Sequence, residues 1–348
     1  MSTRVLVSIV AYDSSKYLRH CLDSLRAQRY QDFSVSLWDN ASKDETPEIA
    51  AEYTGFLGAA HFSNRNVGFC AAHNRIIHES SSDYVLVLNP DVILEPDFLQ
   101  VLVQALDLDP AAGSASGKLW RWGGETVPGL RSPKSHDEKR ILDTTGIYFT
   151  RNQRHLDRGS GEPDAGRYDR REYVFGASGA AAFYRRAMLD TIRSGHEYFD
   201  EAFFAYREDA DLAWRAQWMG WRCLYVPEAR GYHVRQVLPE RRSQLSEAIN
   251  MHSFKNRFLL RVKNMDTGTY LRFFLPITAR DVGALAYVLM RERSSLRAIP
   301  LFFKALPQAW KYRKALRRHR RVPPREVRAW FSNRPVAKPS DAGSSGNP

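Results

Sequence analysis

Cysteine is scarce in this chain, and its scarcity excludes two classes of protein. The 348 residues include only Cys21, Cys70 and Cys223, which are widely separated and odd in number. They form neither a disulfide framework nor the paired spacing of a zinc site. We therefore expect three core residues in a protein of the reducing cytoplasm.

Long apolar runs without charges are also missing. The most apolar stretch, 271–290, is interrupted by Arg272, Arg280 and Asp281, so it lacks a window of about twenty apolar residues that would span a bilayer. The amino terminus runs directly into an apolar segment at residue 5, which leaves no room for the separate apolar region of a signal peptide. We predict a cytoplasmic protein without a spanning helix.

Acidic residues almost disappear near the carboxyl end. Residues 302–334 contain eleven Lys and Arg but one acid, Glu326, and so carry most of the net charge of +12. Because the rest of the chain is close to neutral, its surface is not built throughout for nucleic acid. Basic and apolar side chains together favour a helical region at 263–334 that lies on an anionic membrane surface. A Ser-, Gly- and Pro-rich tail at 335–348 is expected to be disordered.

What the sequence does contain is a folded α/β core. The hydrophobic content of 43% is that of a globular protein. The apolar run 84–88 predicts a strand buried on both faces, as in a parallel sheet covered by helices. Pro90 ends this strand and leaves Asp91 just beyond its carboxyl end, the edge where open α/β sheets bind ligands. Asp91 is thus a candidate to hold a metal that carries a phosphate ester, and a helix cap is the alternative.

Strands and helices alternate through the first half. Strands at 4–12 and 33–38 each precede a polar turn and a helix, which predicts right-handed crossovers and a mostly parallel sheet. Asp39 follows the second strand on the ligand-binding edge. After a short strand at 61–62, Gly68 permits a close backbone approach where a helix start offers N–H groups to an anion. An ordinary turn glycine is the equal alternative.

The region 113–173 is rich in Gly, Pro, Arg, Asp and Ser. We predict mainly loops there, facing an acceptor, with one short strand at 146–149. The small residues that follow, Gly176 to Ala182, permit either a close ligand approach or close packing of neighbouring segments. No further assignment follows from composition alone.

Acids and aromatics mix between 199 and 215, where a helix begins that Gly220 ends. Helical spacing places Asp209 on the inward face and puts Asp211 beside Arg215 on a more solvated face. Asp209 is therefore the better candidate for a buried working carboxylate. The alternative is that the acids only favour the positive end of the helix. A strand at 222–226 precedes His233, which is placed to return to the Asp91 site.

These motifs, in this order, resemble the family 2 glycosyltransferases of the GT-A fold, especially the rhamnosyltransferase-type branch that builds bacterial surface polysaccharides. The resemblance covers about residues 4–260 and rests on the segments 7–12, 39–44, 66–74, 88–91 and 199–209 with His233. It implies an α/β GT-A domain at 1–262, with a nucleotide-sugar half at 1–112 and an acceptor and catalytic half at 113–262.

The resemblance also implies residue roles. Asp209, with Glu208 beside it, matches the catalytic base. Asp91 stands in the D-x-D metal motif, where Asn89 replaces the first Asp, and His233 resembles a metal ligand of some relatives. The residues expected to contact the nucleotide are Ala11, Tyr12, Asp39, Asn66, Gly68, Asn74 and Asn89. Those expected to contact the acceptor are Ser178, Gly179 and Asp211.

The function implied is a metal-dependent, inverting sugar transfer. Mg²⁺ or Mn²⁺ at Asp91 would stabilise the leaving diphosphate, while Asp209 takes the proton of the acceptor hydroxyl. The expected donor is a nucleoside-diphosphate sugar, with dTDP-rhamnose favoured. The expected acceptor is a lipid-linked saccharide at the inner face of the cell membrane. A basic-tailed nucleic-acid-binding protein and a nucleotidyltransferase are the alternatives, although the glycine-rich, lysine-bearing loop of the latter is absent after Tyr12.

Overall fold

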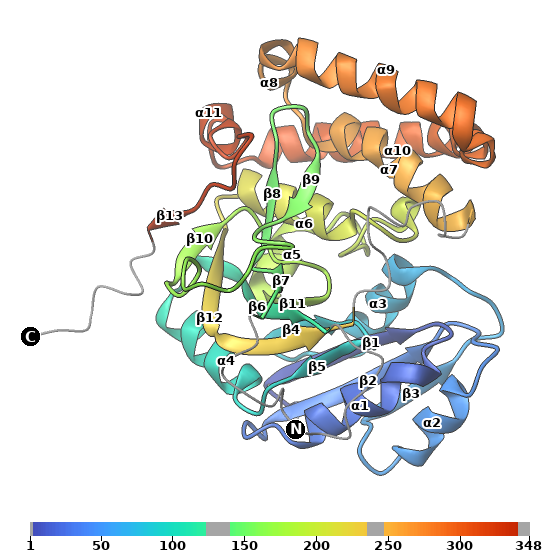
Figure 1. Ribbon diagram of the computed structural model, residues 1–348, viewed down its shortest axis with the longest axis vertical. Coiled ribbons are helices and arrows are strands. Elements are labelled where there is room, and N and C mark those ends of the chain that lie inside the picture. The colour runs from blue at the N-terminus through green and yellow to red at the C-terminus, as the bar shows by residue number, and fades with distance from the viewer. Residues whose placement is uncertain (1–2, 123–139, 235–246, 340–348) are drawn as a thin grey trace, which may run out of the picture.

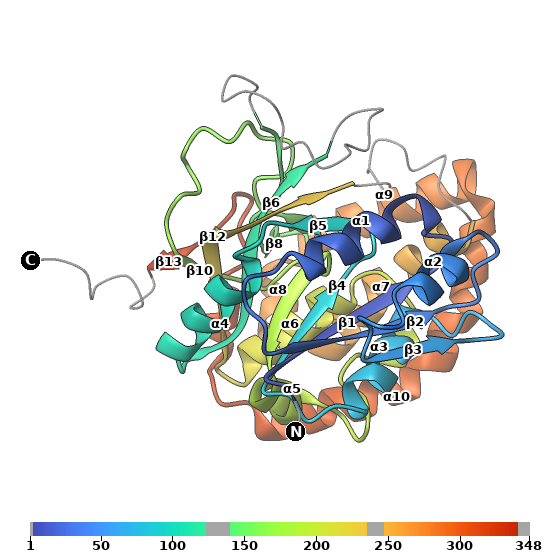
Figure 2. The ribbon, with the colours of Figure 1, turned by 90° about the horizontal axis from the view of Figure 1, so that it is seen from below.

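A mixed sheet of eleven strands forms the centre of the molecule, and helices flank it (Figures 1 and 2). The computed structural model describes residues 3–122, 140–234 and 247–339. The main path of the sheet runs β13-β10-β12-β6-β11-β4-β1-β2-β3, with β5 and β7 attached to its side. The predicted α/β architecture is therefore confirmed, although parallel pairing is confined to two parts of the sheet.

The first parallel part contains the strands that were predicted from apolar runs. Its members are β4 (Tyr84–Leu88), β1 (Val5–Ala11), β2 (Phe33–Asp39) and β3 (Ala59–Phe62). Every residue of β1 and β4 is buried, which explains their continuous apolar character. The flanking helices are α1 (Ser15–Arg26), α2 (Thr46–Glu52), α3 (Phe69–His78) and α4 (Phe98–Leu108).

The second parallel part pairs β6 (Ala112–Arg121) with β12 (Arg222–His233). Strand β11 (Ala181–Arg185) lies between β4 and β6 and is antiparallel to both. Strand β5 (Val92–Leu94), which was not predicted, follows the turn at Pro90 and pairs with the end of β12. Helices α5 (Arg186–Ile192) and α6 (Glu208–Trp218) follow β11, separated by the short 3₁₀ helix η1 (Glu201–Phe203).

The prediction of loops across 113–173 is wrong for much of that region. It contains most of β6, together with β7 (Leu142–Thr144), β8 (Ile147–Phe149), β9 (His155–Asp157) and the start of β10 (Glu172–Val174). The small residues of β6 reflect close packing rather than a loop. A Cβ at Gly113 would lie 2.7 Å from Met188 Cγ, and one at Gly117 would lie 2.7 Å from the ring of Phe98. Residues 123–139 of the predicted loop lie outside the described part of the chain.

The carboxyl-terminal helices pack onto the same core. They are α7 (Glu247–Asn264), α8 (Thr267–Arg272), α9 (Phe274–Arg291), α10 (Ala298–His319) and α11 (Pro324–Arg328), with the 3₁₀ helix η3 (Arg293–Arg297) after α9 (Figure 1). The predicted boundary at residue 262 falls inside α7. Beyond α11, Phe331 contacts the rings of Phe149 and Trp214, with centroids 5.9 and 5.1 Å away. Residues 263–334 are thus no separate appendage.

Strand β13 (Lys338–Pro339) pairs with β10, which contradicts the prediction of disorder from residue 335 onwards. The rest of that prediction, at 340–348, lies outside the described residues. Within the ranges that the structure describes, no helix is long and apolar enough to cross a membrane.

Candidate active site

Two candidate carboxylates, Asp91 and Asp209, lie at one edge of the sheet, where β4 ends. The N–H of Asn89 donates to the carbonyl of Ala180 at 2.9 Å, and the N–H of the neighbouring Gly179 donates to Asp209 Oδ2 at 3.1 Å. This pair of hydrogen bonds brings the first turn of α6 to the carboxyl end of β4. Asn89, which makes one of them, is two residues before Asp91 in the chain. Residues from both halves of the chain therefore meet at the expected edge of the sheet.

Asp209 is held by backbone donors at the start of α6. Its Oδ1 accepts a hydrogen bond from the N–H of Ala210 at 2.7 Å, and Oδ2 accepts the one from Gly179. The side chain is 12% exposed, so the predicted burial is confirmed. His155 Nε2 lies 3.7 Å from Oδ2. His155 was missed because its strand, β9, was interpreted as loop.

Glu208 lies beside this carboxylate in a different environment. Burial, together with the charge of Asp209, raises the pKa of Glu208 to about 8. Its Oε2 is buried and has no hydrogen-bond partner among the described residues. Glu208 is consequently protonated at neutral pH. Its surroundings thus give it a different environment from the adjacent Asp209 carboxylate.

The segment that leads into α6 has an unusual backbone. Phe204, Tyr206 and Arg207 have positive φ angles of 66°, 71° and 71°. Asn256 of α7, which is completely buried, holds this loop, because its Nδ2 donates to the carbonyls of Phe203, Ala205 and Tyr206 at 2.9, 2.9 and 2.8 Å. Strained backbone persists where its surroundings over-determine it. Helix α7 therefore positions Glu208 and Asp209.

Asp211 is 1% exposed, so the prediction of a solvated face is wrong. Its Oδ2 accepts hydrogen bonds from Lys263 Nζ at 2.8 Å and Arg215 Nε at 2.9 Å, and its Oδ1 accepts one from Asn264 Nδ2 at 2.7 Å. Burial alone would raise the pKa of Asp211, but the Lys263 and Arg215 charges lower it. Both oxygens are engaged inside the protein, which contradicts an acceptor-binding role.

His233 joins the site from the end of β12. Its Nδ1 lies 2.7 Å from Asp143 Oδ2, and its Nε2 lies 3.4 Å from Asp91 Oδ1. Burial lowers the pKa of His233, but the carboxylates of Asp91 and Asp143 outweigh this and raise it to about 10. The expected return of His233 to Asp91 is thus observed, from within a strand rather than after one.

These residues fit a site for a divalent cation that is completed by a ligand. Asp91 Oδ1 is buried and has no hydrogen-bond partner in the described ranges, while Asp143 orients the imidazole toward it as carboxylates orient metal-bound histidines. Among the described residues, no group of three His, Cys, Asp or Glu forms a complete metal cage. A cation here would need further oxygens, as Mg²⁺ takes from phosphates and water.

The predicted nucleotide residues divide into two groups. Asp39, at the end of β2, is 2% exposed, and its Oδ1 has no hydrogen-bond partner in the part of the chain that the structure describes, as expected of a carboxylate that accepts from a ligand. It pairs in register with Ala11, which is followed by the half-exposed Tyr12. Ala11 is completely buried, so an unused side-chain oxygen or exposed surface remains at Asp39 and Tyr12.

Asn74 is not available in the same way. Its amide exchanges hydrogen bonds with the backbone of Phe199 at 2.8 and 2.9 Å, and the side chain is 2% exposed. The nucleotide-binding prediction for Asn74 is contradicted, because its donor and acceptor both fix the segment before η1.

Gly68 has a φ of 88°, and the group that lies close to it is a side chain of the protein rather than a ligand. A Cβ at Gly68 would lie 2.6 Å from the ring of Phe204. Asn66 Oδ1 accepts a hydrogen bond from the N–H of Gly68 at 2.9 Å and so shapes the turn, while its side chain is exposed. This turn therefore packs against the loop before α6.

The small residues near the site also pack closely. Gly176 lies against Ala213 of α6, where a Cβ would overlap it. Ser178 is 8% exposed, and its carbonyl accepts a hydrogen bond from the N–H of Ala181 at 3.3 Å. Gly179 contributes its N–H to Asp209, so its observed role is to position that carboxylate.

The fold and the site together are those of an α/β enzyme with two carboxylates, Asp91 and Asp209, at one edge of its sheet. The sequence matches the family described as "Glycosyl transferase family 2" over residues 6–193. This is more than half of the chain, which therefore belongs to that family and is a glycosyltransferase. The match includes Asp39 and Asp91 but ends before Asp209 and His233.

Similar proteins agree with this assignment. The chain is 28% identical over 242 residues to the N-acetylglucosaminyl-diphospho-decaprenol L-rhamnosyltransferase of Mycobacterium tuberculosis, covering 65% of this chain and 75% of the relative. It is 27% identical over 104 residues to glycosyltransferase GlyA of Streptococcus pneumoniae, covering 30% of this chain and 15% of the relative.

Two solved structures show the same fold. Staphylococcus aureus TarS 1–349 in complex with UDP superposes with a TM-score of 0.52 at 18% identity, covering 93% of this chain and 89% of TarS 1–349. GalNAc-T7 with UDP, GalNAc and Mn²⁺ superposes with a TM-score of 0.55 at 11% identity, covering 75% of this chain and 48% of the GalNAc-T7 chain. The GT-A architecture is thereby established.

Proposed function

We propose that this glycosyltransferase transfers a sugar, with inversion, from a nucleoside-diphosphate donor to a saccharide hydroxyl. The observation that carries the proposal is the position of Asp209, which backbone N–H groups hold at the edge where β4 delivers Asp91. Rhamnose from dTDP-rhamnose is the favoured donor, supported by the resemblance and by the name of the mycobacterial relative.

Asp209 is the general base of the proposed reaction. The acceptor oxygen forms a bond to the anomeric carbon as the bond from that carbon to the diphosphate breaks, and Asp209 takes the hydroxyl proton. The hydrogen bonds from Gly179 and Ala210 fix the carboxylate in place. A positioned base typically contributes about 10²–10⁴ in rate. A single direct displacement inverts the configuration of the anomeric carbon.

Asp91 and His233 are the proposed ligands of Mg²⁺ or Mn²⁺, which would supply Lewis-acid stabilisation of the charge on the leaving diphosphate. Asp143 holds the His233 ring. Asn89 replaces a carboxylate at the start of the metal motif, so Asp91 provides its only negative charge. Asp39, Ala11 and Tyr12 are proposed to contact the nucleoside.

The proposed acceptor is a lipid-linked saccharide, in bacterial cell-surface polysaccharide synthesis at the inner face of the membrane. Support comes from the decaprenol-linked substrate in the name of the mycobacterial relative. The surface of α8 to α10 also exposes large apolar side chains next to many arginines, as interfacial helices do. The most exposed are Leu271, Leu275, Val282, Met290 and Phe303, at 68%, 76%, 62%, 71% and 62%.

The test is Asp209→Asn, which keeps the shape of the side chain and removes the base. We expect transfer to fall by about 10²–10⁴, while a sugar nucleotide with Mn²⁺ still raises the unfolding temperature of the variant. Asp83→Asn is the matched control, because Asp83 is 71% exposed and lies before the amino end of β4, away from the site. Normal turnover by the Asp209 variant would refute the proposed base.

A further inference from the structure

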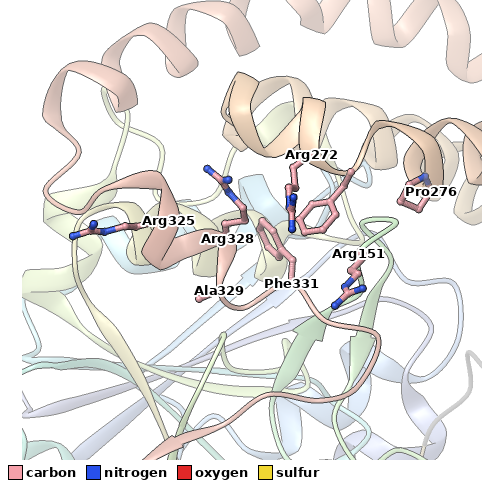
Figure 3. A pocket seen from close by; sticks show the side chains of 8 residues that line it. Arg151, Arg272, Pro276, Arg325, Arg328, Ala329 and Phe331 are labelled. Carbon is pink, nitrogen blue, oxygen red and sulfur yellow. The ribbon is translucent and has the colours of Figure 1, made fainter.

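An arginine-lined pocket lies among the carboxyl-terminal helices, away from the proposed active site. It has a volume of about 460 Å³, within the roughly 300–1,000 Å³ typical of small-molecule sites. Figure 3 shows that its side chains come from three segments: the β8–β9 turn, the α8–α9 junction and α11 with the residues after it. Its lining includes Arg151, Arg272, Arg325, Arg328, Phe273 and Phe331.

The charge of the pocket is uncompensated. Its lining contains four arginines and no acid. Across the part of the chain that the structure describes, none of the four guanidinium groups pairs with a carboxylate within 4.0 Å. Arg328 Nε is buried without a hydrogen-bond partner among those residues. Arginine side chains that line one pocket without an acid can donate to a phosphate group, which accepts bidentate hydrogen bonds from a guanidinium group.

Two exposed apolar residues neighbour the lining of the pocket in the sequence. Leu271 and Leu275 flank the lining residues Arg272, Phe273 and Pro276 in the chain, and are 68% and 76% exposed. Exposed apolar side chains near a basic site are suited to contact acyl chains. This combination selects a phosphate carried by a lipid over a phosphate free in solution.

An aromatic layer separates the pocket from the carboxylate base. Phe331 lines the pocket and contacts Phe149, whose ring is 5.8 Å from that of His155, and His155 approaches Asp209. Phe331, Phe149 and His155 thus lie in sequence between the pocket and Asp209. This separation favours a membrane lipid over the reacting substrate.

We propose that this pocket binds the phosphate headgroup of an anionic phospholipid and so docks the enzyme on the membrane. The inference rests on the proposed membrane association and attributes that association to one specific pocket. General attraction between a basic surface and an anionic bilayer would require no particular arginine. A built site requires Arg272 and Arg328.

The experiment compares three double variants of the full-length protein. Arg272→Gln/Arg328→Gln removes two pocket charges. Arg318→Gln/Arg321→Gln removes the same charge from exposed positions of the basic segment outside the pocket. Arg272→Lys/Arg328→Lys keeps the charge and removes the planar fork of donors. Binding is measured by co-sedimentation with phosphatidylcholine vesicles, with and without phosphatidylglycerol, at physiological ionic strength. Thermal unfolding verifies that each variant is folded.

A surface charge is worth about fivefold in binding to an anionic bilayer, so either glutamine pair loses about thirtyfold by attraction alone. We expect the pocket pair to lose at least about tenfold more, and the lysine pair to bind about tenfold more weakly than the unsubstituted protein. Equal losses in the two glutamine pairs, or an unchanged lysine pair, would overturn the pocket assignment.

Two further arms identify the source of the phosphate. Inorganic diphosphate is expected to compete with the vesicles for the unsubstituted protein. Recruitment by phosphatidylcholine vesicles that contain a polyprenyl diphosphate, without recruitment by phosphatidylglycerol, would overturn the phospholipid assignment. If the unsubstituted protein binds no vesicle, the proposed membrane association itself fails. Stabilisation by a sugar nucleotide is measured in parallel, and its loss would instead count against the proposed enzyme activity.

Discussion

Asn256 offers a direct test of whether α7 positions the proposed catalytic carboxylates. Its amide is the shared donor to three carbonyls of the loop 203–207, and three residues of that loop have positive φ angles. Asn256→Ala removes the donor and leaves these carbonyls inside the protein. The loop is then expected to relax toward negative φ, which shifts Glu208 and Asp209 at the start of α6.

The magnitude follows from the contacts. A typical hydrogen bond contributes about 1 kcal/mol net, and a buried group left unpaired costs about 1–3 kcal/mol. Relief of backbone strain, about 1–3 kcal/mol for each residue in a sparsely populated conformation, offsets part of this loss. We expect a net destabilisation of about 2 kcal/mol, measured by urea unfolding.

The effect on activity should exceed the effect on stability, because a carboxylate displaced by about 1 Å can cost about 10² in rate. We expect kcat to fall by about that factor while KM for the donor changes little. Asn152→Ala, in the β8–β9 turn, is the control, since Asn152 contacts Thr150 rather than the loop before α6. Full kcat in a destabilised Asn256→Ala enzyme would refute the positioning role.

Two further predictions concern buried charges. Lys263→Met leaves the Asp200 carboxylate without its cation and should cost about 3–5 kcal/mol in urea unfolding. A loss below about 1 kcal/mol would show that the hydrogen bond from the N–H of Ala202 is enough to hold Asp200. Because the pKa of Glu208 is raised from 4.5 to about 8, the folded state keeps a proton that the unfolded state has released. Stability should therefore fall by about 1.4 kcal/mol per pH unit across that range and level off above it. Glu208→Gln should flatten this profile, and a slope equal to that of the parent would contradict the shift.

The sequence predicted the first half of the fold well because its strands are buried on both faces. β1 and β4 are continuous apolar runs, and Pro90 marks where β4 has to end. β12 was predicted too short for a related reason. Pro227 should end a strand, but the register of β12 against β6 shifts between Val226 and Arg230, and this irregularity accommodates the proline. His233 consequently lies within the strand.

The candidate site was predictable where a residue follows a strand or begins a helix. Asp39, Asp91 and Asp209 all have such positions. Asp143 and His155 come from short strands in a segment whose composition resembles loop. Asp211 was placed in solvent because the spacing within one helix does not reveal that a second helix, α7, covers it. Such partners are set by tertiary packing, which no local pattern records.

Helix α7 also connects the carboxyl-terminal region to the candidate active site. The family match ends at residue 193, yet residues of α7 contact the segment that carries the carboxylates. Asn256 donates hydrogen bonds to the loop before α6, Lys263 forms an ion pair with Asp211, and Asn264 donates a hydrogen bond to Asp211. Removing the chain from residue 263 onwards would leave Asp200 buried without its cation, would take Lys263 and Asn264 from Asp211, and would take Phe331 from the aromatic core. Helix α7 is therefore part of the packing that holds the proposed catalytic carboxylates. Membrane binding has to be separated from catalysis by exchanging surface arginines, because truncation would remove both together.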